Sequence, residues 1–508
     1  MPASIVLTGL AITDPTPGVY EEINFAQGPA GGFGGVRSVL LIGNRTSTGT
    51  ATVDTAVYGP DTTVPCQTES DVISLFGTGS ELHRMFMRAA KIVAGTTVPI
   101  YLIAVTESAG TAASGTVVYA TTATANGVTR VWVGDEYVDV AITSGDTAIV
   151  IAGNVAAAIN AKTKWAVTAA NGGTATCTIT ARQKGPRGNF IRYQASITAG
   201  IGTTATAATD TQLTSGATAD SNTAALSTIL PQRYYYIASS AEDASQFGAV
   251  NTQVLSQALP TSGIRQRCFA GSTDTLGNVT TIATGLNSAR AEIMWFPKGD
   301  VTPSELAATA AALYAVQEAS GRPRNNFSGF PVTSTDQGFW TIIKQRDATG
   351  FPTRANIVSA LNNGITPIGT LSNGRTYLVK RITTRSLNGS NPDYRVRDAH
   401  KVTVCDFFAD DLHSKVSNQF GGKDLSDDPP KGARPAAPQV CTPSQVRACI
   451  LKLVDDYGDN GLLQRLDVIK TGVIVQRETG NPNRLSARIP LQVIDIADTF
   501  ANAVDQVA

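Results

Sequence analysis

The chain has 508 residues, too many for one hydrophobic core, and its 42% of hydrophobic residues can support several packed domains. Lysine plus arginine and aspartate plus glutamate both number 40, so the formal net charge is zero. This balance lacks the basic excess of a nucleic-acid-binding protein, and no apolar run approaches the length of a membrane span.

The N-terminal segment contains a short strand-like run that stands apart from the rest. Residues 16–25, TPGVYEEINF, join a Pro-Gly turn to β-prone residues and an acidic pair, and the Gly-rich stretch 28–35 separates them from the apolar run that starts at Val36. The first residues lack the basic region of a signal peptide, so we expect a soluble protein made in a cytoplasm. A lone strand must pair with something, either its own sheet or that of a neighbouring subunit.

Strand and helix patterns then alternate in two blocks. In the first block Ser80 is a candidate N-cap, and in the second Thr302 and Glu305 flank a proline in the pattern of a capping box. Strands separated by helices predict an α/β core that is discontinuous in sequence, with parts at 36–106 and 220–340. The predicted strands are 36–43, 98–105, 233–239, 267–272 and 291–297.

The segment between these blocks, residues 107–219, differs in composition. It is rich in Ala, Thr and Gly, and short alternating runs such as TRVWVGDEYVDVAI are separated by Gly/Asn turns. This pattern predicts an inserted all-β sandwich. An insertion costs little when the ends of the host loop lie close together.

A third region covers residues 341–475. It contains a strand-like run, a long helix at 393–416, an exposed Pro/Gly/charge-rich loop, and a second capping-box pattern that begins at Thr442. Beyond it, apolar and polar residues alternate from 485 to 493 with the period of a strand. Strand-like segments thus occur in arms at both ends of the chain, 1–35 and 476–508.

No set of residues indicates catalysis, a metal or a cofactor. His83, His400 and His413 lack ligand spacing, and we interpret them as surface or satisfied side chains. The Gly-rich stretch 28–38 precedes a strand and does not match a phosphate-binding loop, and DDYGDNG at 455–461 departs from the calcium-loop pattern. An α/β enzyme with a β insertion is therefore the least favoured reading.

The six cysteines contain no CxxC pair and do not indicate a disulfide scaffold. Four of them lie in strand or helix patterns and are expected in the core. Cys66 and Cys441 look loop-borne and accessible, so we hypothesise that one of them forms disulfides between subunits in mature particles.

Three segments, in their order along the chain, resemble contractile tail sheath proteins of myophages, and most of all their Mu-like branch. These are PGVYEEIN at 17–24, ALNNGITPI at 360–368, and TGVIVQRETGNPNRLSARIPLQVIDIADTFANAV at 471–504. The resemblance covers the termini and the core, whereas the insertion matches only in kind. It implies a sheath domain at 341–475 that faces the tail tube, outer domains that vary, and strand exchange through both arms.

By this resemblance each subunit would polymerise around the tube and contract to drive it through a host envelope. The implied partners are other copies of the chain, the tail tube protein, and baseplate and tail terminator proteins, in a virion assembled in the host cytoplasm. A non-phage contractile sheath or another phage surface or shell protein, such as an adhesin, is the alternative.

The resemblance also assigns particular residues. Lys452 and Arg465 become candidate tube contacts, because the family's inner surface is its C-terminal domain. The N-terminal donated strand would contain Pro17, Gly18, Val19, Tyr20, Glu21 and Glu22. The C-terminal one would contain Leu485, Arg488, Ile489, Leu491 and Val493.

Overall fold

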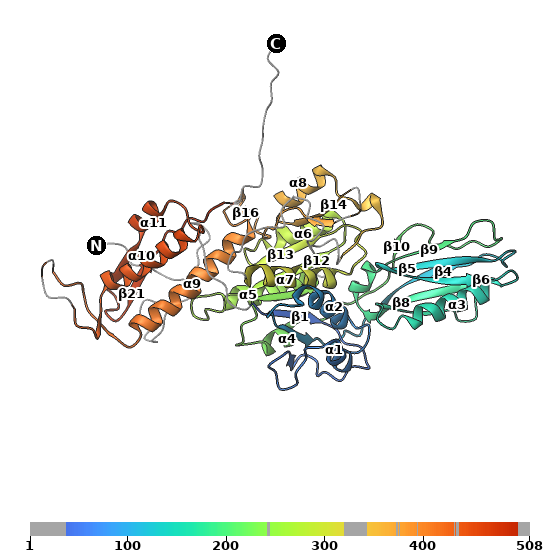
Figure 1. The fold of residues 1–508 in the computed structure, drawn as a ribbon, viewed down its shortest axis with the longest axis horizontal. Helices are drawn as coiled ribbons and strands as arrows, with labels where there is room; N and C mark the ends of the chain where they lie inside the picture. Colours follow the sequence, from blue (N-terminus) through green and yellow to red (C-terminus); the bar gives the residue numbers. More distant parts are fainter. Residues whose placement is uncertain are drawn as a thin grey trace, which may run out of the picture.

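Three bodies of secondary structure follow one another along the long axis of the molecule (Figure 1). A computed structural model describes residues 37–240, 244–319, 343–371, 374, 376–393, 395–430, 432 and 436–495. The predicted N-terminal strand at 16–25 lies outside the described residues. The central body contains the large sheet, the 107–219 segment extends to one side, and the C-terminal helices extend to the other.

The central sheet has eight strands in the order β15-β14-β13-β12-β11-β1-β3-β2. The pairs from β14 to β3 are parallel, while the edge strands β15 and β2 are antiparallel to their neighbours. This mixed α/β sheet confirms the fold class predicted from the alternation, and it joins strands from both sides of the 107–219 segment. Its strands are β1 Val39–Gly43, β2 Val57–Tyr58, β3 Ile100–Ala104, β11 Tyr236–Ser240, β12 Arg267–Ser272, β13 Ala291–Trp295, β14 Thr366–Thr370 and β15 Thr376–Leu378.

Helices cover both faces of this sheet, which explains why its strands read as continuous apolar runs. Alternate residues of β1 lie in different cores: Val39 and Leu41 pack with α1, α2 and α7, whereas Leu40 and Ile42 pack with α4, α5, α6 and α8. The first group is α1 Glu69–Phe76, α2 Glu81–Val93 and α7 Pro303–Ala319. The second is α4 Thr223–Thr228, α5 Ala244–Gln257, α6 Leu276–Leu286 and α8 Arg354–Asn362.

One of the two predicted caps in the core differs from expectation. Ser80 caps α2 as predicted, because its side chain accepts a hydrogen bond from His83 N. At α7 the Thr302 hydroxyl accepts from Glu305 N at 3.4 Å, as predicted, but the Glu305 carboxylate does not close the capping box. The carboxylate instead binds Arg84 at 2.6 Å and Arg88 at 3.1 Å on α2. The ion pairs outcompete the local backbone bond because two guanidinium groups of α2 lie beside this carboxylate.

The 107–219 segment forms two small antiparallel sheets, β10-β9-β5-β6 and β4-β8-β7, around their own hydrophobic cluster. The expectation that it is all-β is wrong, because α3 packs against this cluster. Ile151, Val155 and Ile159 recur at helical spacing in α3 and are buried, a period that the many alanines around them obscured. The elements are β4 Ala112–Val118, β5 Gly127–Val133, β6 Glu136–Ile142, α3 Ala148–Ala161, β7 Val167–Ala170, β8 Thr176–Lys184, β9 Arg192–Ile197 and β10 Thr211–Gln212.

The C-terminal helices and one β-hairpin form a separate lobe around a fourth core cluster. The long helix α9 runs from the central body into this lobe (Figure 1). The capping box at Thr442 is confirmed at the start of α10. The elements are α9 Ala399–Phe420, α10 Pro443–Asp459, α11 Leu466–Gly472, β20 Ile474–Arg477 and β21 Leu485–Arg488, with the short pairs β16 Leu387–Asn388 with β17 Asn391–Pro392, and β18 Asp424–Leu425 with β19 Val440–Cys441.

Replacing Thr442 with alanine is expected to lower the free energy of unfolding by about 1 kcal/mol, because the first turn of α10 loses the hydroxyl that lies 3.1 Å from Ser444 Oγ. Urea unfolding of the full chain would measure the change. The Thr442→Ser variant keeps the hydroxyl and serves as the control. Equal loss in both variants would show that the cap does not contribute.

Candidate assembly surfaces

A buried ionic network joins α9 to the central sheet. Arg267 of β12 and Arg381 both bind the carboxylate of Glu292 on β13, the latter with Nε 3.0 Å from Oε2. Both guanidinium groups also bind Glu318 of α7, and Thr403 of α9 donates to the same Glu318 oxygen at 3.1 Å. All five side chains are buried. The network is therefore a polar joint between sheet, helix layer and lobe.

A second set of ion pairs continues along the same face of α9. Arg290 binds Asp406 through two 2.8 Å hydrogen bonds. One turn further, Asp410 accepts from Arg265 at 3.0 Å and from Arg233 at 2.9 Å. Burial raises the pKa of Asp406, but Arg290 and the neighbouring arginines outweigh that effect, so its pKa lies below the usual range. The carboxylate is charged at neutral pH, and α9 stays bound to the sheet.

The predicted C-terminal donated strand has partners within its own chain. Leu485–Arg488 forms β21, which pairs with β20, and Val493 pairs with Leu463 in the loop after α10. Ile489 and Leu491 pack against the core of the lobe. Donation of these residues to another subunit stays a prediction. It would require them either to leave their partners in this chain or to keep those partners while their free edge pairs with a strand of the other subunit.

The two candidate tube contacts, Lys452 and Arg465, are both exposed. Lys452 lies on the side of α10 opposite the buried Val446, Ile450 and Leu453, and Arg465 is the N-cap of α11 with a left-handed φ of 53°. Among the described residues neither side chain forms an ion pair. Both cations are therefore available to an acidic partner.

The expectation that Cys66 and Cys441 are accessible is wrong. Cys66 is 1% exposed and packs in the core beneath the sheet, and Cys441 is 7% exposed in β19. Burial raises the pKa of Cys66 to about 12 and also raises that of Cys441, which disfavours the reactive thiolate. Apolar neighbours from distant parts of the chain cover both loops. A disulfide between subunits would first require one of these sulfurs to become exposed.

His83 and His400 are buried, whereas His413 is exposed on α9. His83 Nδ1 accepts from Gly79 N at 3.0 Å, and its Nε2 lies 3.3 Å from Glu69. His400 is buried at the start of α9, where Nε2 donates to Ile494 O at 3.4 Å. Over the described residues, no group of three or more acidic, histidine or cysteine side chains is placed to hold a metal ion.

His400 is expected to make stability fall with acidification. Burial lowers its pKa to about 4, against the partly opposing Asp398. The folded pKa lies below the unfolded value of about 6.5, so the unfolded chain takes up the proton first, and the stabilising contribution is lost as pH falls from about 6.5 to about 4. Comparison with His400→Gln by urea unfolding should show the wild type losing roughly 1–3 kcal/mol more over that range. Parallel pH profiles would contradict this role.

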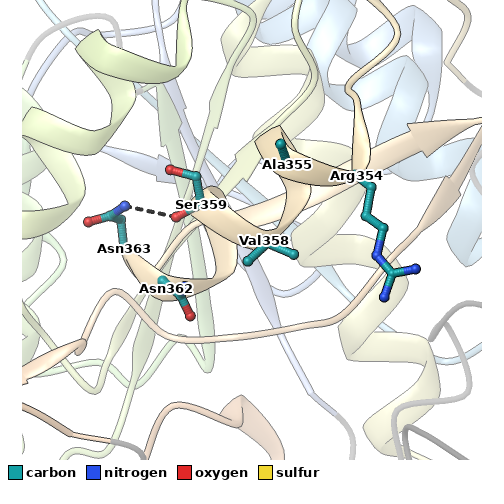
Figure 2. A pocket seen from close by; sticks show the side chains of 6 residues that line it. All are labelled: Arg354, Ala355, Val358, Ser359, Asn362 and Asn363. Atoms are coloured by element: carbon teal, nitrogen blue, oxygen red, sulfur yellow. Dashed lines mark hydrogen bonds between the residues drawn. The ribbon is translucent and has the colours of Figure 1, made fainter. Parts of the chain in front are cut away.

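A shallow hollow lies over α8, lined by that helix and the residue after it (Figure 2). Arg354 is the one charged residue in its lining, and the Asn363 amide donates to Ser359 O at 2.8 Å within the helix itself. This lining offers no acid–base pair or nucleophile with a base. None of the described helices is both long and apolar enough to cross a membrane.

Comparison with known proteins confirms the resemblance seen in the sequence motifs. The chain is 23% identical over 497 residues to the Mu-like prophage FluMu tail sheath protein of Haemophilus influenzae, and the match covers 96% of both chains. No protein-family model matches the chain.

Solved structures similar to the chain include two bacterial sheath tail proteins. That of Desulfitobacterium hafniense is 14% identical with a TM-score of 0.44, and the match covers 92% of this chain and 93% of that one. That of Listeria innocua is 12% identical with a TM-score of 0.43, covering 94% and 99%.

Proposed function

We propose that the chain is the structural subunit of a bacteriophage contractile tail sheath. The observation that carries the proposal is the end-to-end similarity to a Mu-like prophage tail sheath protein, which covers 96% of both chains. The relative matches across core, insertion and C-terminal region together, so a shared isolated domain does not explain it. Capsid and baseplate genes beside the coding sequence would assign it to a phage and not to another contractile injection system.

Contraction in this proposal needs no cofactor. Subunits would pack around a tail tube in an extended state, with energy stored as a difference in inter-subunit contacts between two packings. Strands in the two terminal arms would link each copy to its neighbours, and the Gly-rich stretch 28–35 would bend as the subunits rotate. The internal ion pairs of α9 support this picture, because a subunit whose lobes are fixed together can move as one body.

The proposed partners are other copies of the chain, the tail tube protein, and baseplate and tail terminator proteins, in a virion tail assembled in the host cytoplasm. Deleting residues 1–25 tests the arm. Negative-stain electron microscopy should show long striated tubes from the full chain and none from the truncated one. Dispersed particles from both, even after addition of the tube protein, would refute the sheath proposal.

The tube-facing surface is proposed at α10 and the start of α11, through Lys452 and Arg465. Reversing both charges is expected to abolish co-assembly with the tube protein, because the exposed cations would become repulsive to an acidic tube surface. Co-sedimentation of sheath with tube would measure this. Lys162→Glu, at the exposed end of α3, is the matched control. Intact co-assembly of the double variant would place the tube contact elsewhere.

A further inference from the structure

Arg37, two residues before β1, rests on α9. Arg37 is 3% exposed, and its guanidinium carbon lies 3.8 Å from the ring centroid of Phe407 on α9 and 4.3 Å from that of Tyr235. Such stacking on two aromatic faces holds a buried cation in a fixed place. Arg37 is therefore held against the third turn of α9.

Ile494 and Asp495 rest on the same helix. Lys401 Nζ lies 2.5 Å from Asp495 Oδ1, and His400 Nε2 donates to Ile494 O. The loop after α10 holds the same stretch, since Gln464 Nε2 donates to Val493 O at 2.6 Å. Ile494 and Asp495 are thus held at the first turn of α9.

Contacts with the central body on one side and with α10 on the other hold α9 in place. Asp406 and Asp410 fix it to the sheet, and Phe408 packs edge-on against Tyr457 of α10 with ring centroids 5.2 Å apart. Lys401 and Phe407 are six positions apart, which is about 9 Å along a helix axis. A short, rigid piece of helix therefore separates the attachment points of the two terminal segments.

We propose that α9 transmits tension between the two terminal segments of each subunit. This inference rests on the proposed function, in which those segments link neighbouring copies. Tension that enters at Arg37 passes through its stack on Phe407 into α9, follows the helix back to Lys401, and leaves through the Lys401–Asp495 pair.

Pulling a single full-length chain by its two ends in optical tweezers tests this path without any assembly. The first event under force should be rupture of the Lys401–Asp495 pair. The Lys401→Glu variant should raise the rate of this event, extrapolated to zero force, by about 3- to 10-fold, since attraction becomes repulsion. The charge swap Lys401→Glu with Asp495→Lys should restore it, and the later unfolding of the core should keep its force.

Lys415→Glu is the matched control, because Lys415 pairs with Asp456 at 2.9 Å on the same helix but away from both attachment points. It should leave the first step unchanged. Arg37→Met tests the other end by hydrogen exchange: both it and Lys401→Glu should speed exchange of the amides of residues 403–407, whereas Lys415→Glu should not.

A first step equally sensitive to Lys401→Glu and Lys415→Glu, or a swap that fails to restore it, would overturn the proposal. So would unchanged exchange at residues 403–407 in Arg37→Met. Because both measurements use the isolated chain, their failure would leave the sheath proposal standing. Dispersed particles from both the full and the truncated chain would refute the sheath proposal but would leave the result of the pulling experiment unchanged.

Discussion

Replacing Glu292 with glutamine is expected to lower the free energy of unfolding by about 3–5 kcal/mol. Glu292 is fully buried and accepts from both Arg267 and Arg381. The substitution keeps the shape of the side chain but removes one of the two carboxylates that the buried guanidinium groups share, and Glu318 is the other. Removing one member of a buried ion network costs more than the network contributes, because the remaining charges stay desolvated.

Urea unfolding of the full chain, with hydrogen exchange of β12 and β13 as a local reporter, would measure the Glu292→Gln effect. Asp139→Asn is the matched control, since Asp139 pairs with Arg130 at 2.7 Å on an exposed hairpin. That control should cost less than about 1 kcal/mol. A loss of similar size in both variants would show that the network is solvated or dispensable.

Sequence patterns predicted the parts of the fold that local periodicity controls. The buried strands, the cap at Ser80 and the capping box at Thr442 depend on residues close together in the chain, and the structure confirms them. The ionic joint of α9 was missed, because it depends on contacts between residues that lie from 25 to 177 positions apart. A signal existed: Arg267 and Glu292 are charged residues inside apolar strands, and a buried charge needs a partner.

Exposure and composition misled at other places. Cys66 and Cys441 lie in loop-like sequence but are covered by distant elements, which no local pattern reports. The alanine-rich α3 looked like the β-rich sequence around it, since alanine marks no helical face. For the candidate assembly residues, the patterns gave positions but not partners. The N-terminal strand lies outside the described residues, and the C-terminal one pairs within its own chain.

Replacing Arg187 with methionine is expected to loosen the joint between the insertion and the core, at a cost of about 3–5 kcal/mol. Arg187 binds Glu81 of α2 and Asp220, all three buried. Asp220 also accepts from Ser108 N at 2.6 Å. The two segments that connect the insertion to the core, at Ser108 and at Asp220, therefore meet at the Asp220 carboxylate. Without the guanidinium group, two buried carboxylates would lose the cation that they share and would keep only their backbone donors, Asn44 N and Ser108 N.

The reporter for the Arg187→Met variant is local. Hydrogen exchange should rise at residues 107–110 and 216–222, while the amides of β5 and β8 inside the insertion keep their protection, because the insertion has its own core. Lys164→Ala is the control, since Lys164 also bridges insertion and core, to Glu69 at 2.5 Å, but is exposed. Adding Glu81→Gln to Arg187→Met should recover part of the stability by removing one unpaired charge. If the double variant were less stable than the single one, the cost would come from lost packing and not from charge.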